Sequence, residues 1–356
     1  MKMRISKLYL SKDRLSQLCG ILFLSYIICT PISIMQEFED TRTPLNLHNE
    51  ENLQNEEINQ TFDSQWDWPQ RQFEEAGTPL KSTGLRKLPS TQELTDFVGK
   101  SPVILDGTDS INGQCSEFRR SVNESDRWIG IAGLFNTGTN LLFALLTQNC
   151  IMPTDQHNIH WQVPWGKHTY ADNNGRTAST FKNVSIDRDH GLTIVTTRDP
   201  YEWGKSMCRN PYIVKWYEEP LSNTCPNLTS TVDAWGTHEN LMHFWNLWYQ
   251  KYLDNFPHAK IIVRVEDLTL RPRETIRQIC SCAGGTLANQ FKYVLDSAKL
   301  GPGHKNKSTG MMKAWSRFHW PREARAGLSV ESYEIAMESI DERLMGLFGY
   351  THPPLV

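Results

Sequence analysis

The alternation of apolar and polar positions near the middle of the chain predicts a strand, a loop and a helix in direct succession. Residues 128–132 form a short apolar run with charge before it and glycine after it, which is typical of a buried strand. Apolar residues and good helix formers resume at Leu141, so we expect a helix to begin near Thr139. Residues 133–140 must then form a tight loop from the strand to the helix.

This loop has the glycine spacing of a phosphate-binding loop. Gly133 and Gly138 match the pattern G-x-x-x-x-G-K-[ST], but Thr139 and Asn140 stand in place of the lysine and the hydroxyl residue. In such a loop the backbone N–H groups converge on an anion, and the following helix N-terminus adds a favourable dipole. The missing lysine argues against ordinary ATP or GTP hydrolysis but not against phosphate binding. A plain strand-to-helix turn is the alternative.

A second strand also ends in residues suited to phosphate. Residues 191–197 are a β-branched run, which predicts another buried strand. Arg198 follows it directly, and after it Asp199 can cap a helix whose first turn suits Pro200. Ser206 then lies two turns into that helix, where it can bind one phosphate together with the arginine. A structural arginine paired with a nearby acid is the alternative.

The N-terminal part of the chain has a basic tail, an uncharged run and an acidic segment. The uncharged run has 21 residues, which span about 31 Å as a helix, close to the core of a bilayer. We expect residues 1–14 to be a cytosolic tail and residues 15–35 a transmembrane signal anchor, with a cleaved signal peptide as the alternative. Residues 36–90 are expected to be an acidic disordered stem, from which Trp66, Trp68 and Phe73 could dock on the body. Residues 91–356 are the expected lumenal domain.

Glycosylation sequons and cysteines agree with a lumenal body. Of eight cysteines, two lie in the uncharged run, which leaves an even number for disulfides in an oxidising compartment. Many pairings are possible, and Cys208 with Cys225 is the pair that we favour. No Cys/His spacing resembles a zinc site. All the sequons follow the uncharged run, at Asn59, Asn123, Asn183, Asn227 and Asn306.

Charge argues against one class of partner. The formal net charge is −3, and no cluster of lysine and arginine of the kind that binds nucleic acid occurs in the chain. The part after residue 75 is weakly basic, which is compatible with an anionic ligand.

Residues 135–140 (F-N-T-G-T-N) and the element at residues 198–200 with Ser206 resemble the PAPS-dependent sulfotransferases, where PAPS is 3′-phosphoadenosine 5′-phosphosulfate. The first signature of that family is a strand, a P-K-S-G-T-T-W-like loop and a helix that hold the 5′-phosphosulfate. The second is a strand ending in R-[ND]-P, with a serine further on, that holds the 3′-phosphate. Residues 259–268 are similar to the family's late strand and Y-E-D-L element, so the resemblance covers about residues 128–280.

The resemblance implies a three-layer α/β fold of the P-loop-like sulfotransferase type with a mainly parallel sheet. It implies that PAPS is the co-substrate and that no metal is needed. The residues expected to bind PAPS are Asn136, Thr137, Gly138, Thr139, Asn140, Arg198, Ser206 and Lys307.

One position departs from the family pattern. The loop of the family carries a lysine or arginine that stabilises charge on the leaving phosphate, and Asn136 stands there in this chain. Sulfuryl transfer depends on positioning and electrostatic stabilisation, so the cation must come from elsewhere. We expect it from Lys167, with Lys205 and Lys307 as further candidates, and we count Asn136 itself among the catalytic residues.

The family also needs a base for the proton of the acceptor hydroxyl. Lys167 and His168 resemble its Lys-x-His element without the spacer, so His168 is the expected base, with His160 and Asp172 as alternatives. Consecutive strand residues point to opposite faces. Both Lys167 and His168 can serve only if they lie in a loop, which Gly166 favours.

The sequence thus predicts a single-pass, type II Golgi membrane protein whose lumenal body transfers a sulfuryl group from PAPS to a hydroxyl. A glycan is the expected acceptor class, on which Trp161 and Trp165 could stack; tyrosines and small molecules stay open. Two other functions remain as alternatives: a catalytically silent glycoprotein of the same fold that binds a nucleotide or glycan, and a divergent P-loop kinase.

Overall fold

The computed structural model describes residues 68–79, 88–105, 111–153, 158–172, 186–217, 230–295, 298, 311–312, 315 and 328–353. All of them belong to one compact unit that runs from Ser64 to Val356. The expected cytosolic tail, the expected signal anchor and most of the expected stem lie outside the described residues. Within the described part, no helix is long and apolar enough to cross a membrane.

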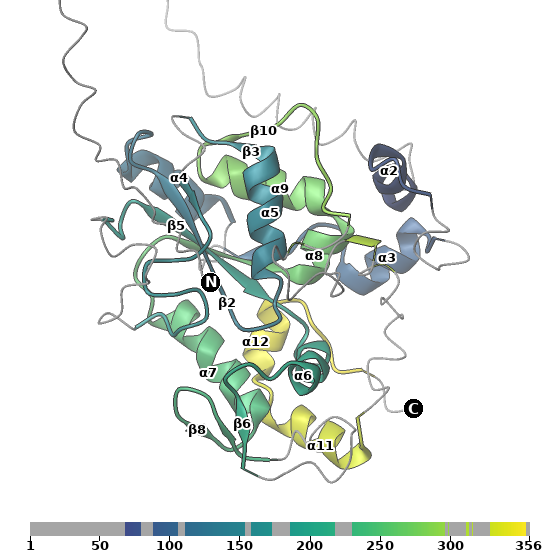
Figure 1. Cartoon of the computed structure of the whole chain (residues 1–356). Coiled ribbons are helices and arrows are strands. Elements are labelled where there is room, and N and C mark those ends of the chain that lie inside the picture. The colour runs from purple at the N-terminus through teal and green to yellow at the C-terminus, as the bar shows by residue number, and fades with distance from the viewer. Residues whose placement is uncertain are drawn as a thin grey trace, which may run out of the picture. The chain divides into compact units, whose positions relative to one another are not determined.

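A central sheet of five strands organises this unit (Figure 1). In hydrogen-bonding order the strands are β1 (Ile104–Leu105), β9 (Lys260–Arg264), β5 (Gly191–Thr197), β2 (Trp128–Gly133) and β4 (Ile159–His160). The last four run parallel, and β1 is antiparallel to β9. The prediction of an α/β fold with a mainly parallel sheet is therefore confirmed.

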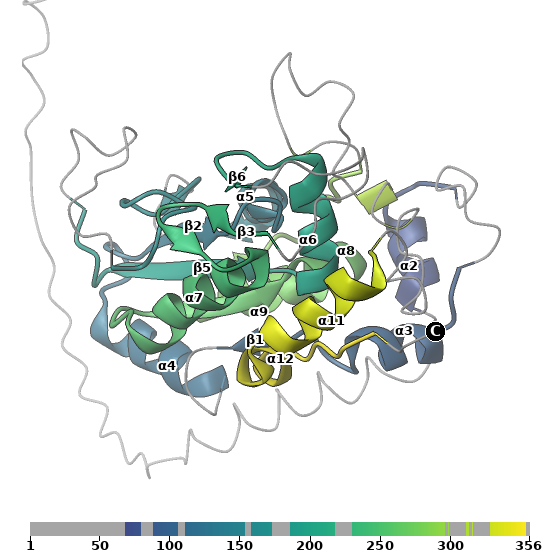
Figure 2. The same cartoon turned by 90° about the horizontal axis from the view of Figure 1, so that it is seen from below.

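Helices cover both faces of the sheet, because successive strand residues point to opposite sides. On β9, Ile261 and Val263 belong to one hydrophobic cluster and Ile262 to the other. The first cluster packs under α4 (Ile111–Ser121), α5 (Thr139–Asn149) and α9 (Pro272–Cys282). The second packs under α6 (Pro200–Arg209), α7 (Leu241–Asp254), α11 (Val330–Ser339) and α12 (Glu342–Leu347). α7, α11 and α12 lie below the sheet in Figure 1 and toward the viewer in Figure 2.

α7 is a long helix that begins at Leu241, directly after Asn240. Oδ1 of Asn240 accepts hydrogen bonds from the N–H groups of Met242 and His243, at 2.9 and 3.0 Å, so this residue caps the helix. The preceding residues belong to a small antiparallel sheet of β6 (Lys215–Trp216), β7 (Val232–Asp233) and β8 (Thr237–His238). The fully buried aromatic side chains of α7 are Phe244, Trp245, Trp248, Tyr249 and Tyr252.

Two disulfides fix α9 to its neighbours. They join Cys115 of α4 to Cys282, and Cys150 to Cys280. Cys150 begins β3 (Cys150–Ile151), which pairs antiparallel with β10 (Thr286–Leu287) just after α9. The disulfides close loops of 167 and 130 residues, and cross-links over such long loops remove much entropy from the unfolded chain. Cys208 is disulfide-bonded as well; Cys225, its expected partner, lies outside the described residues.

The compact unit includes a helix from the segment expected to be stem. α2 (Trp68–Glu75) carries Phe73, which is buried and lies 5.4 Å from the ring of Trp315. Nε2 of Gln72 donates a hydrogen bond of 3.0 Å to the carbonyl of Thr269. The body therefore covers the buried side of α2, within the compact unit that runs from Ser64.

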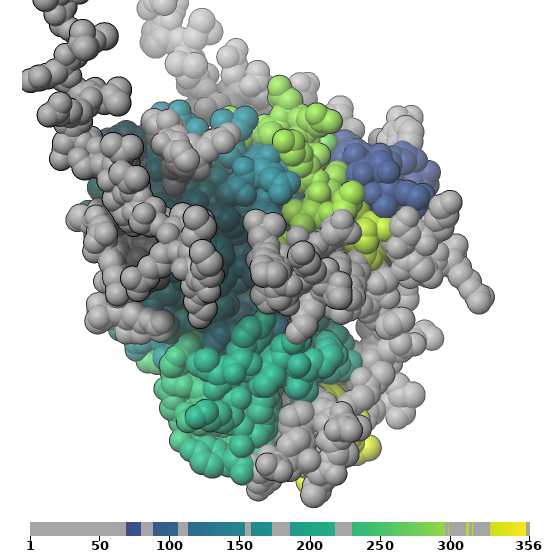
Figure 3. All heavy atoms as spheres, in the orientation of Figure 1, coloured from purple at the N-terminus to yellow at the C-terminus, as the bar shows by residue number. Residues whose placement is uncertain are grey.

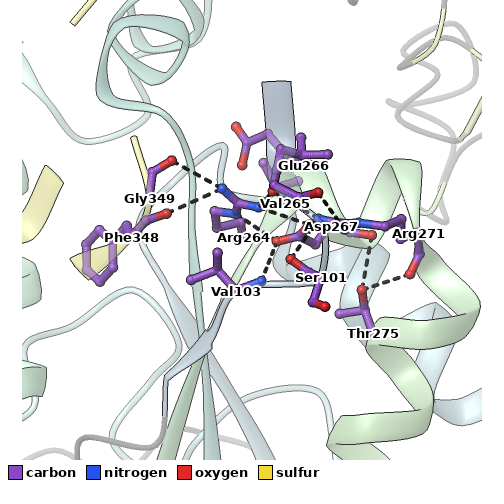
Figure 4. A network of polar contacts seen from close by, with 12 residues as sticks. Ser101, Val103, Arg264, Val265, Glu266, Asp267, Arg271, Thr275, Phe348 and Gly349 are labelled. Atoms are coloured by element: carbon purple, nitrogen blue, oxygen red, sulfur yellow. Dashed lines mark hydrogen bonds and ion pairs between the residues drawn. The ribbon is translucent and has the colours of Figure 1, made fainter. Parts of the chain in front are cut away.

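A buried ionic network ties three distant segments together (Figure 4). Asp267 of α8 (Val265–Leu270) is fully buried, and its carboxylate accepts hydrogen bonds from Arg264 at 2.7 and 3.1 Å and from Arg271 at 2.6 Å. The two guanidinium groups also donate to carbonyls within residues 98–101, at the end of α3 (Thr91–Val98), and within residues 348–349. The network holds the chain where it leaves β9.

Candidate functional site

The candidate site lies at the carboxyl ends of β2 and β5, where the strand order reverses. From β2 the chain passes to β4 on one side and then returns to β5 on the other. In open α/β sheets, ligands bind outside the carboxyl ends of the strands at such a point. Gly133 at the end of β2 is in register with Thr196 near the end of β5. The loop at residues 134–138 and Arg198 therefore emerge side by side.

Close packing explains the two glycines of the loop. A Cβ atom on Gly133 would lie 2.1 Å from Oγ1 of Thr196 and 2.7 Å from Oγ1 of Thr137. Gly138 has a left-handed φ of 82°, and a Cβ there would lie 2.5 Å from a methyl group of Val265. Thr137 is fully buried, and its hydroxyl shares a hydrogen bond of 2.8 Å with that of Thr196. The hydroxyl of Thr137 thus holds the loop against β5. The contact uses the side chain of Thr137 and not the backbone N–H groups that would face a ligand.

The loop leads directly into the N-terminus of α5. The N-cap residue is Gly138, which has no side chain that could satisfy the first N–H groups of the helix. These groups begin at Thr139 and Asn140, and the helix dipole adds positive potential there. Helix N-termini of this kind are favourable positions for anions, and the binding of a phosphate at the N-terminus of α5 stays a prediction.

Lys167 brings a positive charge to the same helix end. Its Nζ donates a hydrogen bond of 2.9 Å to Oδ1 of Asn140 and lies 3.8 Å from the ring centroid of Trp161. Nε1 of Trp161 donates to the same Oδ1 at 3.1 Å. The side chain of Asn140 is thus held by both neighbours, and the ammonium group lies at the first turn of α5.

His168 is oriented by the first glycine of the loop. Its Nδ1 lies 2.6 Å from the carbonyl oxygen of Gly133. A carbonyl can only accept, so Nδ1 carries the proton and Nε2 is the basic nitrogen of the neutral ring. The ring packs on Phe135 at 4.3 Å between centroids. Lys167 and His168 serve the same site from consecutive positions because they lie in a loop in which Gly166 has a φ of 99°.

Arg198 and Ser206 lie on the other side of the loop. Nη1 of Arg198 donates to the carbonyl of Asn136 at 3.4 Å, and Nη2 lies 3.8 Å from a carboxylate oxygen of Glu202. Ser206 is buried on α6, and its carbonyl accepts a hydrogen bond of 3.3 Å from Nδ2 of Asn136. The structure therefore brings Arg198 and the backbone of Ser206 to the loop, and it shows the ion pair with Glu202 that was the alternative. Their joint binding of a phosphate stays a prediction.

Asn136 is turned toward α6 in the structure. It has a left-handed φ of 63°, and its Nδ2 donates to the carbonyls of Ser206 and Asn210, at 3.3 and 3.1 Å, beside the sulfur of Met207. These carbonyls end α6, where a donor is needed. The amide of Asn136 thus joins the loop to α6, while its expected catalytic role stays a prediction.

The other candidates for base and cation are occupied differently. His160 lies on β4 in register with Gly130, three residues before the loop begins, and burial lowers its pKa. Asp172 forms an ion pair with Lys251. Nζ of Lys205 donates to Glu202 at 2.8 Å. Lys307 lies outside the described residues.

One of the two tryptophans expected to stack on a glycan is buried. Trp165 is 1% exposed, and its Nε1 donates a hydrogen bond of 2.9 Å to the hydroxyl of Tyr252 on α7. It belongs to the core and cannot stack on an acceptor. Trp161 is 42% exposed, and the ammonium group of Lys167 lies over its ring in a cation–π contact.

An acidic pair behind Arg198, the half-buried Asp199 and the buried Glu266, was not recognised as part of the site from the sequence. Asp199 caps α6 by accepting from the N–H of Glu202 at 3.0 Å, and its own N–H donates to Glu266 at 3.1 Å. Burial, together with the neighbouring charges of Glu266 and Glu202, raises the pKa of the Asp199 carboxyl to about 7, while the hydrogen bond from the N–H of Glu202 and the charge of Arg198 oppose the rise. Burial also raises the pKa of Glu266. Only the capping role of Asp199 could be predicted, because it depends on neighbours in sequence.

Among the described residues, no group of three or more His, Cys, Asp or Glu side chains could hold a metal ion. Comparison of the chain with protein-family models, with curated proteins and with solved structures gives no match. The assignment of the site therefore depends on its geometry.

Proposed function

We propose that this protein transfers the sulfuryl group of PAPS to a hydroxyl acceptor, on a P-loop-like sulfotransferase fold. One observation carries the proposal: two positions suited to phosphate lie on adjacent parallel strands at the switch point of the sheet. The first is the glycine loop with the N-terminus of α5, and the second is Arg198 with Ser206. A nucleoside that carries a phosphate on its 5′ side and another at its 3′ position fits such a pair.

The residues present fit the phosphosulfate group. The backbone N–H groups of residues 136–140 and the ammonium group of Lys167 would hold it, because both lie at the first turn of α5. Arg198 and the hydroxyl of Ser206 would hold the 3′-phosphate, with Lys307 as a further expected contact. Side chains at residues 133 and 138 would clash with Thr196, Thr137 and Val265 and would displace this loop.

The chemistry follows from His168. Nε2 of His168 accepts the proton of the acceptor hydroxyl while the oxygen attacks sulfur, and the bond from sulfur to the phosphate oxygen breaks. The products are a sulfate ester and adenosine 3′,5′-bisphosphate. The carbonyl of Gly133 accepts from Nδ1 and stabilises the imidazolium that forms. Lys167 offsets the charge on the leaving phosphate.

We further propose that the reaction takes place in the Golgi lumen, on a type II membrane protein, with a glycan as acceptor. The sequons, the disulfides and the uncharged run at residues 15–35 support this location. Asn136 is the feature that supports the second candidate, a catalytically silent glycoprotein of the same fold, since it leaves the loop without its own cation.

Ligand-induced thermal stabilisation tests the proposal. Adenosine 3′,5′-bisphosphate should stabilise the protein more than ATP or 5′-AMP, and a ligand at 100 times its Kd adds about 2.7 kcal/mol. Arg198→Ala should abolish this preference, whereas Arg120→Ala, a change at a surface position of α4, should keep it. Equal or greater stabilisation by ATP would contradict the sulfotransferase assignment and favour a kinase. The silent glycoprotein would be favoured if the wild type prefers adenosine 3′,5′-bisphosphate but turns over no acceptor, and if Asn136→Lys gains activity.

A further inference from the structure

Three aromatic rings form a surface beside His168, which we call the aromatic platform: Phe135, Tyr212 and Trp235. The ring of Phe135 stacks with Tyr212 at 4.9 Å and 15°, and with Trp235 at 5.6 Å and 21°. Phe135 is 7% exposed, whereas Tyr212 is 50% and Trp235 39% exposed. The platform therefore has a buried centre and two large rings that reach the solvent.

The two residues with exposed rings have a strained backbone conformation. Tyr212 and Trp235 have left-handed φ values of 56° and 57°, a region that bulky residues rarely adopt. Such strain collects at functional sites. Trp235 lies in the turn between β7 and β8, directly before Gly236, and a second glycine there would relieve the strain. A tryptophan at this position keeps its ring at the expense of backbone strain.

Contacts within the fold hold the platform in place. Trp235 packs edge-on against Tyr170 at 6.0 Å and lies 6.1 Å from Phe244 of α7. The hydroxyl of Tyr170 is 3.4 Å from Nε2 of His238. In Figure 3 the segments that follow α6, in teal-green, form part of the surface in the lower half of the view. The platform is thus supported from behind and open toward the solvent.

The platform adjoins the reacting groups. Phe135 is the residue before Asn136 in the phosphate loop, and its ring lies 4.3 Å from that of His168. An acceptor must bring a hydroxyl to His168 while the rest of its molecule rests on a neighbouring surface. The platform is such a surface, because the ring of Phe135 packs against His168 and also against Tyr212 and Trp235.

We propose that Tyr212 and Trp235 are the acceptor subsite and bind the apolar face of a pyranose ring whose hydroxyl reaches His168. This inference rests on the proposed function. A sugar ring presents C–H groups on one face, which pack on aromatic rings, and hydroxyl groups at its edge that need water. A platform that is open on one side suits this ligand, since its outer face stays hydrated. A phenol or an apolar side chain would leave apolar area exposed to water on the open side.

Binding measurements test the subsite apart from turnover. N-acetyllactosamine and an unsulfated chondroitin tetrasaccharide would be titrated, with adenosine 3′,5′-bisphosphate present, and followed by tryptophan fluorescence and by isothermal calorimetry. Tyr212→Ala and Trp235→Ala should each weaken saccharide binding about tenfold, the equivalent of one aromatic contact of this kind. Tyr217→Ala is the matched control, because Tyr217 is 65% exposed in the same segment of the chain. In turnover, the loss should appear in KM for the saccharide.

The outcomes separate this inference from the proposed function. Conservative variants, Tyr212→Phe and Trp235→Phe, keep a ring and should retain most of the affinity even if the alanine variants fold poorly. Wild-type saccharide affinity in all four variants would overturn the subsite. Turnover of p-nitrophenol in preference to every saccharide would overturn it as well. In both cases, stabilisation of the protein by adenosine 3′,5′-bisphosphate would leave the sulfotransferase assignment intact. Saccharide binding that depends on both rings, without any preference for the bisphosphate, would keep the subsite and refute the proposed function.

Discussion

Replacing His168 separates its chemical role from its structural one. His168→Asn removes the basic nitrogen but keeps an N–H donor for the carbonyl of Gly133, to which Nδ1 is now bound at 2.6 Å. His168→Ala removes the base, this hydrogen bond and the ring that packs on Phe135 at 4.3 Å. The two variants therefore share the loss of the base and differ in the loss of contacts.

The magnitudes can be worked from these contacts. A hydrogen bond of this kind contributes about 0.5–1.5 kcal/mol and a ring pair about 0.5–1.5 kcal/mol. His168→Ala should thus lower the free energy of unfolding by about 2 kcal/mol, whereas His168→Asn should lower it by about 1 kcal/mol. Loss of a general base lowers turnover by about 10²–10⁴-fold, which corresponds to about 3–5 kcal/mol in the barrier. Turnover should therefore fall to a similar extent in both variants.

The assay is transfer of labelled sulfate from PAPS to the acceptor panel, with thermal denaturation alongside. Binding of adenosine 3′,5′-bisphosphate should stay near the wild-type level in both variants, because the nucleotide is held by the loop and by Arg198. Full turnover in His168→Asn would refute the assignment of the base, and His160→Ala and Asp172→Asn would then be compared. Turnover that follows stability, with Ala inactive and Asn active, would show a purely structural role.

The main features of the sheet and the position of the loop could be predicted because they depend on local signals. The apolar runs at residues 128–132 and 191–197 are the two central strands, and glycine spacing marks the loop between β2 and α5. The expected difficulty with Lys167 and His168 is also resolved locally, since Gly166 permits the loop that turns them to different partners.

Burial and pairing could not be predicted, because they depend on residues far apart in the chain. Trp165 looks like a surface platform in the sequence, but its partner Tyr252 lies 87 residues later on α7. The two disulfides span 130 and 167 residues, so no spacing rule selects them. The side chain of Asn136 meets α6 about 70 residues away. The sequence shows that Asn136 carries no charge, but it could not show this contact with α6.

Three further predictions concern stability and the coupling of the loop. Asp267→Asn leaves two buried guanidinium groups without a counter-charge, so it should lower the free energy of unfolding by about 3–5 kcal/mol, or the Tm by about 10 °C. The control, Asp254→Asn in an exposed ion pair, should lower it by less than about 1 kcal/mol. Equal effects of the two changes in thermal denaturation would contradict this prediction.

Burial raises the pKa of Asp199 to about 7, so the folded protein holds a proton that the unfolded chain loses, and the free energy of unfolding should fall as pH rises from about 4 to about 7. Asp199→Asn, which keeps the helix cap, should remove this part of the fall in thermal denaturation, and unchanged pH profiles would contradict it. Asn136→Ala and Asn136→Gly both lose the amide that joins the loop to α6, but glycine relieves the left-handed backbone at φ 63°. Both should weaken binding of adenosine 3′,5′-bisphosphate about tenfold, the equivalent of one hydrogen bond of about 1.4 kcal/mol. If Asn136→Gly binds as tightly as the wild type, the backbone alone positions the loop, and the coupling to α6 does not contribute.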